Sequence, residues 1–508
     1  MKTPRPVVRR SMAAAVAVAA ASFGLAACGS DESDGSASAN SSSGPIRALL
    51  NAQPSSLDPI VAPRSGQVVW ATMVEPLITT NEDLEPSADG LLTDWERTDP
   101  TTWTFTLREG VMFSNGEAAD AEAVVNTLEL SRDSEGSILK SYFGNVASVE
   151  APDATTVVVK TGTPQYDIPN LLTTVYLVPP DYYEAEGSEG FAVAPVGTGP
   201  YVLDEFQAGR SISVEVNPDY WGEAPDNTGV VFTWATEAAQ RLALLQSDSV
   251  DVSFDLPPAQ ATAAQDAGLE VVSTESAIKI LAFLQSTTAP FDDPQLREAA
   301  ALAIDRDAIV EGIFDGQAVA DGGLLNVKPG TDPAEQVEAD PDAAAAIGGG
   351  GATVPISYPP SQYTNVEEVA RAIGGSLEQA GFKVEYNPLD YGTLVGQVVG
   401  RQLNGLYIFA GVPNVAVPDF FASGFMKSAS ITGNCPDPQI DELVAEALEQ
   451  EDAESAAPVY EELNTLGVVE KHCYVPLYKQ IYHYGLADGV DGVVYSPLNA
   501  VDFTGATS

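Results

Sequence analysis

Residues 217–222 read Asn-Pro-Asp-Tyr-Trp-Gly, and this stretch is the most specific fold signal in the chain. Asn217 followed by Pro218 favours the start of a turn. Tyr220 and Trp221 supply two large aromatic surfaces that can be buried beside that turn. Directly upstream, residues 211–216 alternate polar and apolar side chains, as in a half-buried strand. The sequence therefore predicts a strand that ends in a turn anchored by aromatic packing.

Strand-like and helix-like stretches alternate on both sides of this motif. Residues 101–108 also place apolar side chains at every second position, which predicts a strand. Asp120 is suited to cap a helix that follows it. Asp293 with Pro294 marks the start of a helical region that extends over 296–314.

A later segment has the pattern of a strand–helix–strand unit. Residues 352–358 predict a strand, 366–380 a helix and 382–388 a second strand. Asn365 and Glu368 have the spacing of a capping box at the start of that helix. Such a unit joins parallel strands, so the expected fold class is α/β.

Length and composition exclude several classes of function. The chain has 508 residues, more than one typical domain, and 44% of them are hydrophobic, enough for a packed core. It carries 72 acidic and 23 basic residues, a formal charge of −49. Binding to nucleic acid or to anionic lipid needs clustered Lys and Arg, so both are excluded as partners. With two histidines in the whole chain, histidine-based catalysis is not expected.

The first residues have the build of a secretory signal. Four basic residues precede an apolar run that is too short to span a bilayer. Leu25-Ala26-Ala27-Cys28 resembles a bacterial lipobox, in which Cys28 carries the lipid; the alternative is an ordinary signal peptide with an incidental Cys. The predicted signal peptide is 1–27, and Arg9-Arg10 hints at a twin-arginine secretion route.

The segment after the predicted cleavage site is rich in Ser, Gly, Asp and Asn. Residues 28–44 are therefore expected to comprise the lipidated Cys and a flexible tether. After cleavage, 72 acidic and 19 basic residues remain, a formal charge of −53. We expect most of this charge to be solvated surface.

Cys435 and Cys473 remain as an even pair in an exported protein. An oxidising compartment favours a disulfide between them. The alternative is a metal site formed by His472, Cys473 and His483, which would have few ligands for a stable site.

Several more segments accompany residues 217–222 in a recurring order. They are residues 54–59 (Pro-Ser-Ser-Leu-Asp-Pro), 75–77 (Glu-Pro-Leu), 103–111 (Trp-Thr-Phe-Thr-Leu-Arg-Glu-Gly-Val), 113–116 (Phe-Ser-Asn-Gly), 197–201 (Gly-Thr-Gly-Pro-Tyr), 290–293 (Pro-Phe-Asp-Asp), 303–306 (Ala-Ile-Asp-Arg) and 475–478 (Val-Pro-Leu-Tyr). In order and spacing, the chain resembles family 5 of the bacterial extracellular solute-binding proteins, the large two-lobed lipoprotein receptors of peptide and nickel ABC importers.

The resemblance implies a type II Venus-flytrap fold with mixed sheets flanked by helices. Lobe I would comprise 45–278 plus 480–508, with an extra subdomain at about 85–190, and lobe II would comprise 285–474. Two hinge strands, at about 279–284 and 474–479, would join the lobes and allow closure around a ligand. The disulfide would then lie in lobe II near a hinge.

The resemblance also implies where a ligand binds. In the family's peptide receptors, an extended ligand pairs with backbone from both lobes, here Pro63-Arg64-Ser65 and Gly411-Val412-Pro413-Asn414. The family commonly places an Asp that holds the ligand's ammonium group where this chain has Asn414. Asn keeps hydrogen-bonding capacity and lacks the charge, which puts a free-amine peptide in doubt.

Three tyrosines are candidates for pocket walls in lobe II. Tyr358, Tyr363 and Tyr391 could equally be core or rim residues. No cofactor is expected.

The expected function is a monomeric extracytoplasmic receptor, anchored by lipid to the outer face of the cell membrane. It would deliver a peptide-like solute to an ABC permease and its ATPase. A neutral or modified small molecule, a nickel complex, or a sensor role without transport are the alternatives. No catalytic motif with supporting context is present in the sequence, so an enzyme is not expected.

Overall fold

The computed structural model describes residues 44–508 except 62–65, 141, 361 and 414. The predicted signal peptide, Cys28 and most of the predicted tether lie outside the described residues. No helix in the described part of the chain is both long enough and apolar enough to cross a bilayer.

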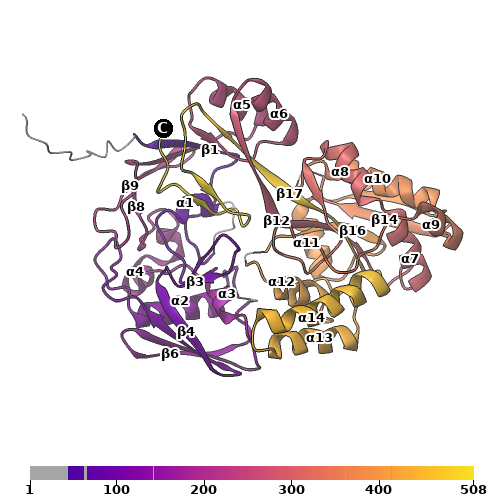
Figure 1. Ribbon diagram of the computed structural model, residues 1–508, viewed down its shortest axis with the longest axis horizontal. Coiled ribbons are helices and arrows are strands. Elements are labelled where there is room, and N and C mark those ends of the chain that lie inside the picture. The colour runs from indigo at the N-terminus through magenta and orange to yellow at the C-terminus, as the bar shows by residue number, and fades with distance from the viewer. Residues whose placement is uncertain (1–43, 62–65, 141, 361, 414) are drawn as a thin grey trace, which may run out of the picture. The chain divides into compact units, whose positions relative to one another are not determined.

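An 11-stranded mixed sheet is the frame of the molecule (Figure 1). The strand order is β15-β14-β16-β12-β17-β11-β1-β10-β9-β8, and β13 pairs with β17. The strands are β1 Ile46–Leu50, β8 Tyr201–Gln207, β9 Ser211–Val216, β10 Gly229–Trp234, β11 Val252–Ser253, β12 Glu270–Leu284, β13 Ala318–Ala320, β14 Thr353–Tyr358, β15 Lys383–Pro388, β16 Leu406–Gly411 and β17 Tyr474–Leu486. We call the part around β1 and β8–β11 lobe I and the part around β13–β16 lobe II.

Two long strands join the lobes. β12 and β17 run antiparallel, and Figure 1 shows them side by side between the two parts of the chain. Residues 270–275 of β12 pair with 481–486 of β17, residues 279–283 pair with 474–479 of β17, and residues 279–284 pair with β16. Between these halves the register shifts. The residue boundaries proposed for the lobes and hinges stay a prediction.

A second sheet lies in the N-terminal half of the chain. Its order is β4-β5-β7-β6, all antiparallel. The strands are β4 Leu92–Asp99, β5 Thr102–Leu107, β6 Val146–Asp153 and β7 Thr156–Thr161. Two short hairpins pair β2 Thr79–Thr80 with β3 Pro86–Ser87 and β18 Val494–Tyr495 with β19 Val501–Asp502.

Helices pack on both faces of the sheet in lobe II, and further helices lie in the rest of the chain. The helices are α1 Gln67–Trp70, α2 Ala121–Asp133, α3 Ile168–Leu172, α4 Pro180–Phe191, α5 Ala238–Gln246, α6 Pro258–Asp266, α7 Pro294–Ala303, α8 Arg306–Phe314, α9 Pro341–Ile347, α10 Val366–Gln379, α11 Tyr391–Val399, α12 Asp419–Phe421, α13 Pro438–Glu449 and α14 Ala453–Asn464, with π-helical turns at Ala422–Met426 and Thr465–Glu470. In β16, alternate residues enter two different cores: Leu406 and Ile408 pack with α10, and Tyr407 and Phe409 with α13 and α14. A strand that is buried on both faces reads as a continuous apolar run, as 406–411 does.

The motif at 217–222 forms a turn that gathers other family segments. Tyr220 Oη and Trp221 Nε1 donate hydrogen bonds to the two carboxylate oxygens of Glu75, at 3.0 and 2.8 Å. The guanidinium of Arg108 lies 4.5 Å from the Trp221 ring centre. Asn217 Nδ2 donates to the carbonyl of Gly199 at 2.9 Å. These motif residues therefore hold the scaffold together.

Most expected elements are confirmed, with two differences. Asp120 accepts a hydrogen bond from the Ala123 amide at 3.1 Å, and β14, α10 and β15 form the predicted parallel unit. The helical region 296–314 is divided, because Ile304 leaves the helical conformation and Asp305 caps α8. The predicted capping box at Asn365 is wrong: its backbone is left-handed and its side chain donates to the Ile313 carbonyl instead.

Candidate solute-binding site

In both lobes, the parallel strands run toward the same place. β1 and β10 run parallel in lobe I, and β14 and β16 run parallel in lobe II. β11 and β12 are both antiparallel to β17, and β1 is parallel to β11, so β12 runs in the same direction as β1. β16 is antiparallel to β12. The carboxyl ends of the two parallel sets therefore face each other. Ligands of α/β sheets bind at such ends.

A cavity of about 860 Å³ lies at this place. Its volume falls within the usual range for small-molecule sites. Residues 50–52 after β1, Thr236 after β10, 362–364 after β14 and Val412 after β16 all line it. β12 and β17 contribute Ile278 and 480–483.

Most polar side chains of the cavity are neutral. They are Asn51, Thr236, Gln317, Gln362, Thr364, Gln480 and Asn499. Phe254, Phe314 and Tyr363 supply aromatic surface. Amides, hydroxyls and rings together suit an uncharged polar backbone such as that of a peptide.

The charged groups of the lining gather in lobe I. Among the described residues, they are Arg241 and Asp255. Arg241 is buried and donates to three backbone carbonyls: Ala235 and Thr236, both at 2.9 Å, and Asp255 at 2.7 Å. Burial lowers the pKa of Arg241 and raises the pKa of Asp255.

Three buried polar side-chain atoms in the lining have no hydrogen-bond partner among the described residues: Arg241 Nε, Tyr478 Oη and His483 Nε2. The side chains of Tyr478 and His483 are almost fully buried. The other ring nitrogen of His483 lies 2.8 Å from Ser273 Oγ. Burial lowers the pKa of His483, so its neutral form is favoured. Orphaned polar atoms at a cavity wall are ready to bind a ligand or water.

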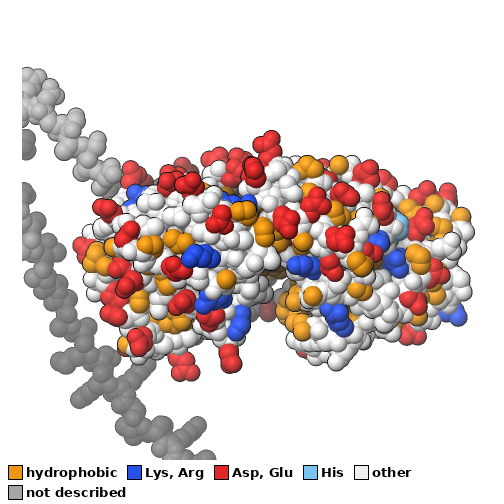
Figure 2. All heavy atoms as spheres, turned by 90° about the horizontal axis from the view of Figure 1, so that it is seen from below, with side chains coloured by type: hydrophobic (Ala, Val, Ile, Leu, Met, Phe, Trp, Pro, Cys, Tyr) orange, Lys and Arg blue, Asp and Glu red, His pale blue; other side chains and the backbone are white. Residues whose placement is uncertain are grey.

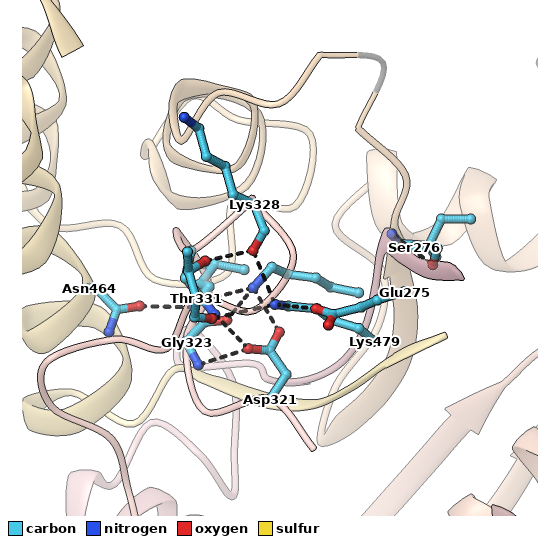
Figure 3. A network of polar contacts seen from close by, with 12 residues as sticks. Glu275, Ser276, Asp321, Gly323, Lys328, Thr331, Asn464 and Lys479 are labelled. Atoms are coloured by element: carbon cyan, nitrogen blue, oxygen red, sulfur yellow. Dashed lines mark hydrogen bonds and ion pairs between the residues drawn. The ribbon is translucent and has the colours of Figure 1, made fainter. Parts of the chain in front are cut away.

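Two buried lysines, Lys279 and Lys479, lie opposite each other where the crossing strands change register. Figure 3 shows the polar network that includes Lys479, Glu275 and Asp321. Lys279 Nζ binds Asp321 Oδ2 at 2.7 Å, the Gly323 carbonyl at 2.8 Å and Asn326 Oδ1 at 2.8 Å. Lys479 Nζ binds Glu275 at 2.9 Å. Burial lowers the pKa of Lys279 to about 8, against the attraction of Asp321. The network ties residues 321–331 to the strands that join the lobes.

The lobes also touch through the second sheet's domain. Tyr166 inserts into a core of lobe II, and Val415 and Val417 insert into the core beneath the second sheet. Arg97 Nη1 donates to the Gln450 carbonyl at 2.6 Å, and the rings of Tyr142 and Phe420 stack at 5.9 Å. The structure is therefore a closed arrangement of these surfaces.

Two carboxyl groups lie at this contact: that of Asp167 is fully buried and that of Asp419 is half-buried. Burial, and then the charge of Asp419, raises the pKa of Asp167 to about 7; burial raises the pKa of Asp419 to about 6. Asp167 accepts from Gln165 Nε2 at 2.9 Å through one oxygen, and its other oxygen has no described partner. Asp419 accepts from Ser423 Oγ at 2.7 Å.

Cys435 and Cys473 form a disulfide in the structure. Both residues belong to the lobe II core that contains Tyr474 of β17. The bond thus joins the start of β17 to the segment before α13. His472 and His483 do not form a metal site with it, since no three His, Cys, Asp or Glu side chains within the described residues are placed to hold an ion.

The predicted site residues divide into four groups. Tyr363 and Val412 line the cavity, and the Tyr363 hydroxyl accepts from the Ala410 amide at 3.1 Å. Tyr358, Gly411 and Pro413 are buried and are not part of this lining. Tyr391 is 40% exposed and stacks on Phe409. Pro63, Arg64, Ser65 and Asn414 lie outside the described residues.

Sequence reasoning did not single out Arg241 and Asp255, which line the cavity in lobe I. Neither belongs to a motif, and Tyr478 was expected only within the family segment 475–478 and a hinge strand. The signal that could have found them is positional, because Asp255 directly follows β11 and Thr236 follows β10. This signal can be used only when the pairing of the strands is known, and the sequence alone does not show that pairing.

Two sets of parallel strands that face one cavity, joined by two crossing strands, define a two-lobed receptor of the periplasmic-binding type. Residues 88–433 match the model of the bacterial extracellular solute-binding proteins, family 5. The chain belongs to this family, whose members are extracytoplasmic solute-binding proteins.

Named relatives and structures agree with this assignment. The chain is 27% identical over 405 residues to the glutathione-binding protein GsiB of Salmonella paratyphi A, covering 75% of this chain and 78% of the relative. The ABC transporter substrate-binding protein CtaP of Listeria monocytogenes has a TM-score of 0.81 at 18% identity, covering 92% and 99% of the chains. DppA of Helicobacter pylori in complex with the peptide STSA has a TM-score of 0.74 at 20% identity, covering 91% and 98%.

Proposed function

We propose that this protein captures a peptide or peptide-like solute between its lobes and delivers it to an ABC permease and its ATPase. The observation that carries the proposal is the cavity at the facing strand ends, which takes lining residues from both lobes and from both crossing strands. A solute there would touch both lobes at once, and it would stabilise their closed arrangement.

The chemistry of the cavity supports the peptide class. Neutral amides and hydroxyls can pair with a peptide backbone without regard to its side chains. The family's relatives include one named for glutathione, itself a small peptide, and a structural neighbour that holds a peptide. A neutral or modified small molecule fits the same lining. For nickel, no three His, Cys, Asp or Glu side chains among the described residues are placed to hold the ion.

The protein would work at the outer face of the membrane as a monomer. The lipobox at Cys28 would provide the anchor, and residues 29–44 would provide the tether. Figure 2 shows Asp and Glu side chains spread over the visible face, as expected of solvated surface charge.

Native mass spectrometry of the chain expressed from residue 29 tests the proposed substrate class. We expect an adduct whose mass and fragments correspond to a short peptide. Release by mild denaturation should return the bare chain. An adduct that contains nickel, or one without peptide fragments, would contradict the peptide class.

A further inference from the structure

Asp255 is an unusual residue in the wall of the cavity. It follows β11 and has a left-handed backbone, with φ of 51°. Its carbonyl accepts a hydrogen bond from Arg241 Nη2 at 2.7 Å. The same guanidinium donates to two carbonyls of the neighbouring loop after β10. Non-glycine residues seldom adopt this backbone conformation, and they keep it where the surrounding structure holds them in place.

Burial raises the pKa of Asp255, and the nearby charge of Arg241 opposes that rise without bonding to the carboxylate. The side chain of Asp255 has no hydrogen bond or ion pair among the described residues, although it is half-buried and lines the cavity. It is also the one carboxylate among the described lining residues. A desolvated carboxylate without a partner carries a free-energy cost that a cationic group would relieve.

His483 supplies a second, independent polar group at the same end of the cavity. The Leu256 amide donates to the His483 carbonyl at 3.0 Å, which fixes β17 beside residue 255. His483 is 4% exposed, and its Nε2 atom has no described partner. With Ser273 Oγ at Nδ1, the ring can present Nε2 as a hydrogen-bond acceptor.

We infer that Asp255 and His483 form the subsite that receives a positively charged nitrogen of the solute, such as the amino terminus of a peptide. The inference rests on the proposed function and places the charged end of the ligand in lobe I. Arg241 is a positioning residue: it holds the backbone of Asp255 and leaves the carboxylate facing the solute.

The test compares two probes on three forms of the mature chain by calorimetry. The probes are Ala-Ala-Ala and N-acetyl-Ala-Ala-Ala, which differ in the ammonium group. The forms are wild type, Asp255→Asn and Asp266→Asn. Asn tolerates the left-handed backbone as well as Asp does, so Asp255→Asn should fold. Asp266 is exposed at the end of α6 outside the cavity and controls for the loss of one charge.

We expect Asp255→Asn to weaken binding of Ala-Ala-Ala by about 10- to 100-fold, the usual value of a charge-assisted hydrogen bond. Binding of the acetylated probe should change little, and Asp266→Asn should bind both probes like wild type. If Asp255→Asn binds Ala-Ala-Ala like wild type, the subsite is wrong and the peptide function stands. If wild type binds neither probe, the peptide function fails and the subsite fails with it.

Discussion

Lys279 is a single buried residue whose side chain connects two segments of the fold. Its side chain is 0% exposed, and each of its three acceptors belongs to residues 321–326. A buried ion pair adds little net stability, but one partner left alone is costly. The pair therefore acts as a specific tie between β12 and the segment after β13.

Replacing Lys279 with Met should destabilise the protein by about 3–5 kcal/mol, because Asp321 would remain as an uncompensated buried charge. Urea unfolding at neutral pH measures this free energy of unfolding. Lys383→Met, exposed on β15, is the control and should have little effect. A second change, Asp321→Leu, should restore most of the loss. Equal stability of Lys279→Met and Lys383→Met would contradict the account.

The sequence revealed few of the site's residues. Tyr363 and Val412 could be predicted because they follow strands with clear apolar patterns and a family motif. Asp255, Arg241 and His483 could not, because their roles arise from contacts between segments far apart in the chain. In a chain with 72 acidic residues, no single Asp is distinguished by composition.

At the scale of elements, the outcome depended on local signals. Asp120 and Asp293 cap their helices as predicted, since both caps use contacts within a few residues. The helical region 296–314 was predicted as one because its apolar positions continue through the break. Asp305 is the signal that was overlooked: it accepts from the Ala308 amide and starts α8.

The carboxyls of Asp167 and Asp419 should make the stability of the folded protein depend on pH. A carboxyl whose pKa is raised on burial binds a proton more tightly in the folded state than in the unfolded one. The stability that these two carboxyls contribute is therefore present at low pH and is lost as pH rises through about 6 to 7. Arg97 and Lys427 oppose the shift but do not remove it.

Thermal unfolding of the mature chain should show this dependence. Between pH 8 and pH 5.5, the melting temperature of wild type should rise more than that of Asp167→Asn, which carries no titrating group at this position. Glu122→Gln, exposed on α2, controls for the general loss of charge repulsion and should behave like wild type. The same rise in Asp167→Asn as in wild type would show that this carboxyl pair is not the cause.

At the scale of the molecule, the α/β class and the family order of motifs were accessible from sequence. The order of strands was not, because pairing between β1, β11, β17 and β12 joins residues 191 to 234 positions apart. That pairing makes the carboxyl ends of both lobes face one cavity. The central claim is thus a property of topology: solute binds between the lobes and holds them closed.

Small-angle X-ray scattering of the chain expressed from residue 29 tests this claim most directly. The protein is stripped of bound solute by mild denaturation and refolding, and scattering is recorded before and after Ala-Ala-Ala is added at saturation. We predict that the radius of gyration falls on addition, because the lobes close about β12 and β17. A bound peptide that leaves the radius of gyration unchanged would contradict the account.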